Sequence, residues 1–363
     1  MNEFCINGRF LTQKITGEQR YAIEMVKALD SIVDKNWSIL VPNDKIINKL
    51  DLKNIQIKQV GLLKGHLWEQ LEVPYYSKGK CLINFCDMAP IIKSNQIVFI
   101  HDMQILSHPE HYTFKFRKWH EFVEKKLVHK VVSIFTVSSF SKHEIMKYWH
   151  VPSEKISVLP CACSPELQKN VFLKDFLAKN KINHSKKILL AVSSMQRNKN
   201  FSGIIKSLQY LDTNRVELII AGGINRKLFS IDNTDLKNIN SKFNNIKFVG
   251  YVSDEELITL YKFADCFIFP SFYEGFGIPP IEAMYNGCPV VVSNTSALPE
   301  TCGNAALYCN PYDPKDIATK INLILNNNDL AEKYSMLGLN KVKEYSWVKN
   351  AEKFYSFIQR NFN

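Results

Sequence analysis

Short apolar segments alternate with amphipathic segments along almost the whole chain, and this alternation limits the folds that the chain can adopt. One amphipathic segment follows Gly17, where apolar residues recur at helical spacing (Ala22, Met25, Val26 and Leu29). The apolar segments predict strands at 4–6, 37–41, 55–60, 82–85, 97–100 and 134–137, and again at 188–192, 217–221, 246–249, 266–269 and 290–293. Strands that alternate with helices form parallel sheets covered on both faces. The sequence therefore predicts an α/β protein.

The strands fall into two series, and a chain of 363 residues is long enough for two domains. We expect two doubly wound, Rossmann-like domains at 1–165 and 166–345, with their sheets facing a central cleft, and a final segment at 346–363. In such folds the ligand lies at the carboxyl ends of the strands, so we expect the site in that cleft.

Composition narrows the class of protein. The apolar fraction of 46% supports real cores, and the net charge of +11 is divided almost evenly between 1–165 and the remainder. An even spread argues against a nucleic-acid tail and favours a basic surface that meets anionic lipid or a nucleotide diphosphate. No apolar run is long enough to span a bilayer, so we expect a cytosolic protein.

The nine cysteines are an odd number, and several lie in apolar, strand-like surroundings. We expect reduced and mostly buried thiols. Cys161-x-Cys163 and Cys81-x4-Cys86 lack the spacing of a zinc site, so we expect no bound metal.

The segment 270–283 carries the most chemical information. It places Glu274 and Glu282 on either side of a glycine-bearing turn, between the apolar run 265–270 and an expected helix start at 280–284. Backbone N–H groups at a helix N-terminus favour phosphate oxygens, while carboxylates accept hydrogen bonds from hydroxyls. This combination suits a sugar nucleotide.

Six motifs in order along the chain resemble those of a GT-B glycosyltransferase of the large retaining family 4. The most specific is the E-x7-E pair Glu274 and Glu282. The others are Asn7-Gly8-Arg9 with Thr16-Gly17-Glu18-Gln19-Arg20-Tyr21, His101-Asp102, Thr136-Val137-Ser138-Ser139-Phe140-Ser141, the basic loop 193–200, and Phe248-Val249-Gly250-Tyr251 followed by Ser253-Asp254-Glu255-Glu256-Leu257. The resemblance extends over nearly the whole chain. It implies a donor-binding second domain, an acceptor-binding first domain, and a final helix that packs on the first domain.

The resemblance also assigns roles to single residues. Glu274 is expected to accept hydrogen bonds from the transferred sugar and Glu282 from the ribose. Lys199 and Arg197 are expected to stabilise the leaving diphosphate, and His101 to lie against the donor sugar. The remaining expected donor-binding residues are Gly17, Gly250, Tyr251, Gly275, Phe276, Gly277 and Ile278, and the expected acceptor-side residues are Thr16 and Asp102.

Each role has a structural alternative. Glu282 can simply favour the first turn of a helix, and Gly17 can be a helix-entry glycine. His101 can be a buried structural histidine. Asp102 can orient His101, cap the next segment or contact the acceptor. Lys199 and Arg197 can belong to a solvated loop.

The chain contains no Asp-x-Asp motif, which many transferases use to hold a divalent metal. Cationic side chains are the natural substitute, so we expect catalysis without a metal. Two departures from the family pattern stand out: Asn198 occupies the place of the usual arginine beside Lys199, and 161–164 replaces the usual Asn-Gly-Val-Asp.

The segment 112–130 contains six Lys or Arg, two Glu and five aromatic residues. Such a helix either lies on an anionic bilayer near a lipid-linked acceptor or is a solvated surface helix.

The expected function is transfer of a sugar to a saccharide or lipid-linked saccharide in O-antigen or capsule biosynthesis, with retention of configuration. Resemblance to bacterial mannosyltransferases makes GDP-mannose the first expected donor, with UDP- or dTDP-sugars as alternatives. A sugar-nucleotide epimerase and a non-catalytic scaffold for membrane or nucleic acid are further alternatives. The expected partners are a nucleotide sugar, the acceptor and the inner membrane surface, without nucleic acid.

Overall fold

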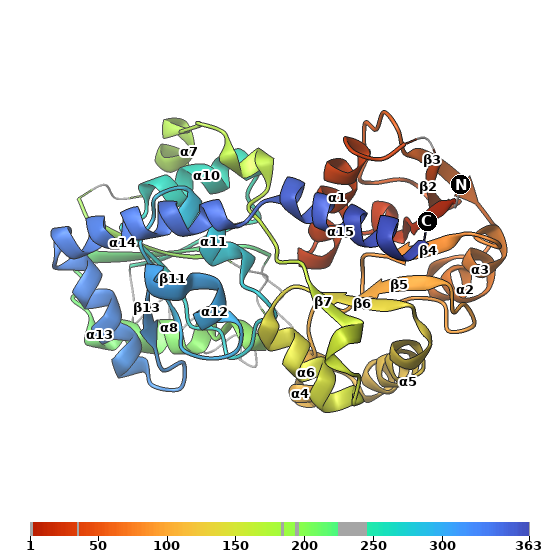
Figure 1. The fold of residues 1–363 in the computed structure, drawn as a ribbon. Helices are drawn as coiled ribbons and strands as arrows, with labels where there is room; N and C mark the ends of the chain where they lie inside the picture. The colour runs from red at the N-terminus through yellow and green to blue at the C-terminus, as the bar shows by residue number, and fades with distance from the viewer. Residues whose placement is uncertain (1–2, 35, 183–184, 193–195, 224–244, 363) are drawn as a thin grey trace. The chain divides into compact units, whose positions relative to one another are not determined.

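The computed structural model describes residues 3–34, 36–182, 185–192, 196–223 and 245–362, and the chain divides into two compact units (Figure 1). Unit 1 contains 1–161 together with 346–363, and unit 2 contains 162–345. The boundary expected at 165 falls just inside unit 2. The final segment belongs to unit 1, so the chain leaves this unit once and returns to it.

Unit 1 is built on a seven-stranded sheet in which every described strand pair is parallel. The strands are β1 (Phe4–Asn7), β2 (Trp37–Pro42), β3 (Gln56–Val60), β4 (Cys81–Asn84), β5 (Gln96–Phe99), β6 (Ser133–Thr136) and β7 (Ile156–Val158), in the order β3-β2-β1-β4-β5-β6-β7. Its helices are α1 (Gly17–Asp30), α2 (Gly65–Leu67), α3 (Val73–Tyr76), α4 (Gln104–Ser107), α5 (Phe114–Lys130), α6 (Ser139–Trp149) and α15 (Trp347–Phe362).

Helices cover the sheet of unit 1 because both of its faces are apolar. Val123 and Leu127 of α5 and Ile145 of α6 pack with Val98 and Ile134 of the sheet in one buried cluster. The final helix α15 lies against α1 (Figure 1). Aromatic rings join α15 to this unit, and the pairs are Trp347 with Tyr21, and Phe354 with Phe85, Phe99 and Phe135.

Unit 2 repeats the plan with a six-stranded sheet, also parallel in every described pair. The strands are β8 (Lys187–Val192), β9 (Val216–Ala221), β10 (Ile246–Gly250), β11 (Cys266–Phe269), β12 (Val290–Ser293) and β13 (Ala306–Cys309), in the order β10-β9-β8-β11-β12-β13. The described helices are α7 (Lys174–Lys179), α8 (Phe201–Ser207), α10 (Asp254–Phe263), α11 (Ile278–Tyr285), α12 (Leu298–Cys302), α13 (Pro314–Leu325) and α14 (Asn328–Lys341).

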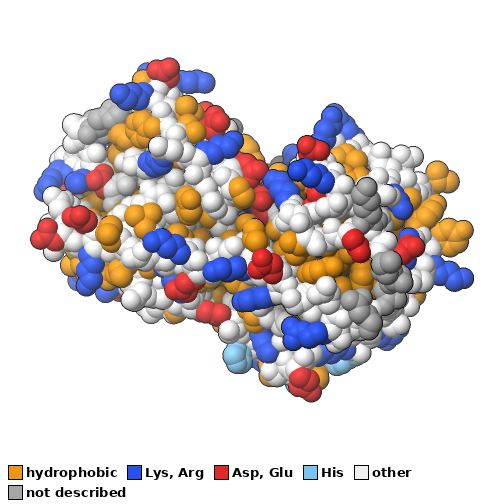
Figure 2. Space-filling model, turned by 45° about the horizontal axis from the view of Figure 1, so that its top comes forward, with side chains coloured by type: hydrophobic (Ala, Val, Ile, Leu, Met, Phe, Trp, Pro, Cys, Tyr) orange, Lys and Arg blue, Asp and Glu red, His pale blue; other side chains and the backbone are white. Residues whose placement is uncertain are grey.

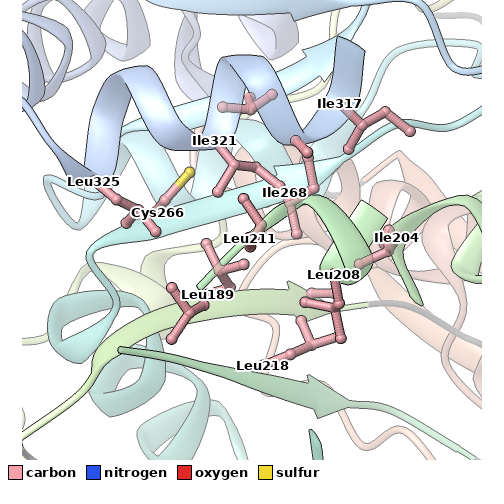
Figure 3. Packing of buried hydrophobic residues seen from close by; sticks show 14 of the residues in the cluster. Leu189, Ile204, Leu208, Leu211, Leu218, Cys266, Ile268, Ile317, Ile321 and Leu325 are labelled. Atoms are coloured by element: carbon pink, nitrogen blue, oxygen red, sulfur yellow. The ribbon is translucent and has the colours of Figure 1, made fainter. Parts of the chain in front are cut away.

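The core of unit 2 lies between its central strands and the helices α8 and α13 (Figure 3). Leu189, Leu218 and Ile268 project from three neighbouring strands and meet Ile317 and Ile321 of α13. These side chains are essentially inaccessible to solvent, and burying one such side chain contributes about 1.5–3 kcal/mol. The core therefore holds the ends of β8 and β11 in fixed positions.

The eleven predicted strands are all present, with ends that shift by one residue at most. Two edge strands, β7 and β13, were missed. Each is only three or four residues long and pairs with a neighbour on one side, so fewer of its side chains need to be apolar.

Each sheet reverses its strand order once. In unit 1 the reversal lies between β1 and β4, and in unit 2 it lies between β8 and β11. The loops that leave the carboxyl ends of two such strands diverge to opposite faces of the sheet and leave a crevice, which is where open α/β sheets bind ligands. The topology thus marks one candidate position in each unit.

Candidate functional site

The reversal point of unit 2 brings two of the predicted motifs together. The basic loop follows β8, and Pro270 to Gly277 follow the neighbouring strand β11. Ser193, Ser194 and Met195 of the basic loop lie outside the described residues, and the description resumes at Gln196. A short helical turn at Arg197–Lys199 then leads into α8, whose N-cap is Asn200.

Lys199 and Glu274 form an ion pair at this point. The Lys199 ammonium donates to both carboxylate oxygens of Glu274, at 2.7 Å to Oε1 and 2.9 Å to Oε2. The side chains retain only 15% and 10% of their exposure, so the pair is largely shielded from water. Lys199 also lies over the ring of Phe269, 5.2 Å from its centroid, which adds a cation–π contact.

Ser271 holds the Glu274 carboxylate from the other side. Its hydroxyl is fully buried and contacts Glu274 Oε1, and it lies 2.8 Å from the Asn198 carbonyl oxygen. Asn198 in turn accepts a hydrogen bond from the Phe272 amide at 2.8 Å. The loops after β8 and β11 are therefore tied to each other, and the carboxylate has a fixed position.

The Glu274 carboxylate and the Lys199 ammonium each keep hydrogen-bonding capacity that these contacts do not use. A carboxylate has about four lone-pair sites, and Lys199 and Ser271 occupy three of them on Glu274. An ammonium has three N–H donors, and Glu274 takes two from Lys199. The pair can thus accept a hydrogen bond from a sugar hydroxyl and donate one to a phosphate oxygen.

The glycine turn that follows has its own structural requirement. Gly277 has φ of 101°, and a Cβ at this position would lie 2.5 Å from Leu298 Cδ2, so only glycine fits without strain. The Phe276 carbonyl accepts a hydrogen bond from Thr301 Oγ1 at 2.7 Å, and the Glu274 amide donates to Ser296 Oγ at 3.0 Å. The Phe276 ring contacts Tyr345. Gly275 and Phe276 are therefore held in a defined turn.

Glu282 lies on α11, which begins at Ile278 rather than near Pro280 as expected, with prolines in its first turn. Because of this earlier start, Glu282 falls beyond the first turn, and the structural alternative of a first-turn acid does not apply. The carboxylate is buried and accepts a hydrogen bond from the Tyr261 hydroxyl at 3.1 Å. Burial, and then the charge of Glu282, raise the pKa of Tyr261 well above its ordinary value, which keeps this hydroxyl a donor.

Other predicted donor residues lie apart from this pair. Arg197 is exposed at the start of the turn that carries Lys199. Gly250 is the last residue of β10 and Tyr251 follows it; β10 is separated from β8 by β9, and Tyr251 is 83% exposed. Gly250 has φ of 74°, which again favours glycine.

His101 in unit 1 is a buried side chain with defined partners. Its Nε2 lies 2.8 Å from the Phe85 carbonyl oxygen, and its ring packs against Tyr21 edge to face. Because a carbonyl only accepts, Nε2 carries the proton in this contact. Burial lowers the pKa of His101, against the opposing charge of Glu18. The imidazole is therefore neutral at neutral pH.

The other predicted residues of unit 1 lie at helix starts. Asp102 Oδ1 accepts a hydrogen bond from the Gln104 amide at 2.8 Å, in the turn that leads into α4, whose N-cap is Met103. Thr16 is the N-cap of α1 and Gly17 its first residue, and the Thr16 amide donates to Gln19 Oε1 at 3.1 Å. Open space surrounds the position that a Cβ on Gly17 would take.

Sequence reasoning missed several residues of the unit 2 site. Ser271, Ser296 and Tyr261 each bind a predicted residue; Ser271 lies in the segment 270–283 but was given no role, and Ser296 and Tyr261 lie outside the motifs. Ser271 directly precedes the aromatic pair before Glu274, and its position after a predicted strand was the available signal. Ser296 and Tyr261 come from other elements, so only the fold brings them to the site.

The described residues offer neither a cluster of metal ligands nor a membrane-spanning helix. They contain no group of three or more His, Cys, Asp or Glu side chains that is placed to hold a metal ion. Within the same residues, every helix falls short of the length and apolar character that crossing a bilayer requires.

Similarity to known proteins agrees with this geometry. Residues 174–340 match the family of glycosyl transferases group 1. The chain is 32% identical over 271 residues to O-antigen chain mannosyltransferase B of Escherichia coli, covering 69% of this chain and 66% of that enzyme. It is 30% identical over 249 residues to O-antigen chain mannosyltransferase RfbU of Salmonella typhimurium, covering 68% and 65%. The aligned parts thus span slightly less than two thirds of these relatives.

The fold is also shared with solved structures. Sucrose-phosphate synthase from Thermosynechococcus elongatus superposes with a TM-score of 0.78, covering 100% of this chain and 99% of that one at 15% identity. This likeness concerns the fold alone. Taken with the sequence matches, it shows that the chain belongs to the group 1 glycosyltransferases and has the GT-B fold.

Proposed function

We propose that the chain is a retaining, metal-independent mannosyltransferase that moves mannose from GDP-mannose to a saccharide or lipid-linked saccharide in surface-polysaccharide biosynthesis. The observation that carries this proposal is the ion pair of Lys199 and Glu274 at the reversal point of unit 2. It places one carboxylate and one cation, each with bonding capacity left, where an α/β sheet binds its ligand.

The pair suits the charges of a nucleotide sugar. Glu274 accepts a hydrogen bond from a hydroxyl of the transferred sugar, and charge-assisted bonds of this kind contribute about 1.5–3 kcal/mol. Lys199 donates to an oxygen of the diphosphate, where negative charge develops as the sugar leaves. Glu282, beside Tyr261, accepts hydrogen bonds from the ribose hydroxyls.

In the proposed reaction the bond between the anomeric carbon and the diphosphate oxygen breaks, and a bond forms from the acceptor hydroxyl oxygen to the same face of that carbon. The acceptor proton passes to the departing diphosphate. Lys199 and Arg197 take the electrostatic role that a metal has in other transferases. This assignment follows from the absence of Asp-x-Asp in the sequence and from the position of Lys199.

The sugar and the acceptor follow from the relatives. Two of these are described as O-antigen chain mannosyltransferases, and this supports mannose and a polysaccharide acceptor. A UDP- or dTDP-sugar is the second candidate donor. A nucleic-acid scaffold is less favoured, because on the face that Figure 2 shows the Lys and Arg side chains are dispersed among acidic ones and form no single basic tract.

We also propose that unit 1 contacts anionic membrane through α5. The exposed side of this helix carries Phe114, Phe116, Trp119 and Phe122, which are 67%, 43%, 37% and 51% exposed. Lysines and an arginine lie among them (Lys115, Arg117, Lys118, Lys125, Lys126 and Lys130). We call these ten residues the basic aromatic face. Aromatic and basic side chains on one helix side suit the interface of an anionic bilayer, where a lipid-linked acceptor would lie.

A thermal-shift screen with GDP-, UDP- and dTDP-sugars identifies the donor, because a ligand that binds only the folded chain raises its melting temperature. We expect GDP-mannose to give the largest shift. Transfer is then measured with and without EDTA, and the anomeric configuration of the product is read by NMR. No shift with any nucleotide sugar would refute the donor assignment. Loss of activity with EDTA, or an inverted product, would refute the mechanism.

Glu274→Ala provides the residue-level test of the same proposal. We expect this variant to lose transfer while GDP still raises its melting temperature, because Glu274 is assigned to the sugar and not to the nucleotide. The control variant is Glu154→Ala, which removes an exposed carboxylate of unit 1 and is expected to leave transfer unchanged. Glu217 is not used as the control because it is buried and paired with Lys247. Full turnover by Glu274→Ala would remove Glu274 from the site.

A further inference from the structure

Unit 1 contains a cavity of about 180 Å³ that the proposed donor site does not use. It lies where Asn7 ends β1 and Asn84 ends β4, and the strand order of the sheet reverses between these two strands. This is the position at which an open α/β sheet binds a ligand. The cavity of unit 1 therefore corresponds in topology to the Lys199 and Glu274 site of unit 2.

A buried polar network lines one side of the cavity and fixes it. Asn7 Nδ2 donates to Glu69 Oε1 at 2.9 Å and to Asn84 Oδ1 at 3.1 Å. Arg9 donates to Glu69 Oε2 at 2.7 Å. Burial by itself would raise the pKa of Glu69, but His66, Arg9 and Asn7 outweigh it, and the pKa is lowered. Glu69 is thus ionised and its charge balances that of Arg9.

Two further carboxyl groups face the cavity without a cation of their own among the described residues. Asp87 Oδ1 accepts a hydrogen bond from the His101 amide at 2.8 Å, and Glu18 has no hydrogen-bond or ion-pair partner within the described part of the chain. Of the two histidines in the lining, His66 contacts Glu69 at 3.2 Å and His120 lies 3.8 Å from Glu124. Burial, and then the charge of Glu18, raise the pKa of Asp87, so the carboxylate that repels anions in this cavity is that of Glu18.

Aromatic rings provide the apolar part of the lining. Phe10 is buried at one wall, and Phe116 of α5 lies at another with 43% of its side chain exposed. A pyranose ring has an apolar face of C–H groups and a rim of hydroxyls. Such a ring stacks on an aromatic side chain while its hydroxyls donate to carboxylates, which is the division of polar and apolar groups that small-molecule sites use.

We propose that this cavity binds one neutral hexose unit of the acceptor and excludes acidic sugars and phosphate groups. This inference rests on the proposed function, since it names the class of acceptor for the same reaction. The size agrees, because a water molecule needs only about 10–15 Å³ of such volume, so a cavity of about 180 Å³ holds several waters and has room for one sugar ring. Glu18 accepts hydrogen bonds from its hydroxyls, Asp87 lies beside it as a second polar group, and Phe116 stacks on its face.

Saturation-transfer NMR on the full chain tests the inference without a donor. The probes are methyl α-D-mannopyranoside as the neutral sugar and D-glucuronate as the anion, and inorganic phosphate, which carries no C–H protons, is tested as a competitor of the neutral probe. We expect saturation transfer to the neutral probe, none to glucuronate, and no competition by phosphate. Glu18→Gln and Phe116→Ala are each expected to raise the dissociation constant of the neutral probe about tenfold or more.

Matched controls separate this effect from a general disturbance. Glu154→Gln removes an exposed carboxylate elsewhere in unit 1, and Phe114→Ala removes an exposed ring of α5 that does not line the cavity. Neither is expected to change the dissociation constant. Far-UV circular dichroism and the melting temperature of each variant show whether it is folded.

Three results would overturn the inference. They are glucuronate or phosphate binding as tightly as the neutral sugar, no binding of the neutral sugar, or folded Glu18→Gln and Phe116→Ala variants that bind it as well as the unmodified chain. The donor screen is run on the same samples. Failure of every nucleotide sugar to raise the melting temperature refutes the proposed function, whereas the saccharide measurements judge the cavity separately.

Discussion

Separating the charges of Lys199 and Glu274 gives the most direct test of the unit 2 site. Glu274→Gln keeps the shape of the side chain and its contact with Ser271 but removes the negative charge. Lys199 then loses its charged partner and keeps its cation–π contact with Phe269 and at most a hydrogen bond to an uncharged amide oxygen. Lys199→Met has the converse effect, because it leaves the Glu274 carboxylate with one hydroxyl donor in place of three N–H and O–H donors.

The structure sets the expected size of the effect. Removing one partner of a fully buried ion pair costs about 3–5 kcal/mol. The two side chains here retain 15% and 10% exposure, so solvent screening reduces the cost to about 2 kcal/mol. A unit of this length loses about 2–4 °C of melting temperature per kcal/mol, which predicts a decrease of about 4–8 °C for each single variant.

The double variant distinguishes pairing from two independent effects. It leaves neither charge unpaired, so we expect it to be more stable than the sum of the single changes predicts, with a coupling of about 1–2 kcal/mol. Additive losses, or single variants that melt with the unmodified chain, would refute the reasoning that the two groups form one shielded pair.

The distribution of tryptophan provides an internal control for this assay. All five tryptophans of the chain, Trp37, Trp68, Trp119, Trp149 and Trp347, belong to unit 1. Calorimetry records the unfolding of both units, whereas tryptophan fluorescence reports unit 1. A decrease that calorimetry detects and fluorescence does not would assign the lost stability to unit 2.

Three further predictions concern other features. Burial, and then the charge of Glu18, raise the pKa of Asp87 in the folded chain. The stability that this group contributes is therefore complete below its unfolded pKa of about 4, and it is lost as pH rises through the higher folded value. Asp87→Asn should therefore gain melting temperature relative to the unmodified chain as pH rises, and a difference that is constant with pH would contradict this. Gly277→Ala should destabilise the chain by about 1–3 kcal/mol, because alanine is strained at this positive φ. Gly17→Ala places its methyl group in open space at a helix start and should leave the melting temperature unchanged. Equal effects of the two variants in thermal unfolding would contradict the conformational argument. In flotation assays with vesicles, the chain should bind anionic and not neutral lipid. Salt and the double substitution Trp119→Ala with Phe122→Ala should each weaken this binding. Equal binding to anionic and neutral lipid would refute membrane contact through the basic aromatic face.

The strands could be predicted from the sequence because burial on both faces demands continuous apolar runs. The runs at 188–192 and 266–269 correspond to β8 and β11, which lie in the middle of their sheet. The edge strands β7 and β13 carry a weaker pattern, since only one side of each is paired. Local chemistry also predicted the glycine turn, and Gly277 with its positive φ is the physical reason for that signal.

Helix boundaries were less predictable than helix positions. The motif around Pro280 indicated a helix with proline near its start, yet α11 begins at Ile278 because Gly277 provides the N-cap in a left-handed conformation. Two residues of difference decide whether Glu282 lies in the first turn. Dihedral angles at a cap depend on the packing of the turn, here against Leu298, and that packing joins segments far apart in the sequence.

By itself, the sequence determined the two series of strands, the order of the motifs and the presence of Glu274, Glu282 and Lys199. Only the tertiary structure decided that Lys199 and Glu274 form a shielded pair with Ser271, and that Glu18, Asp87 and Phe116 share one cavity with the ends of β1 and β4. The physical reason is that a parallel sheet places strands that are distant in sequence side by side. The loops at their carboxyl ends then meet, and no local pattern records which side chains those loops bring together.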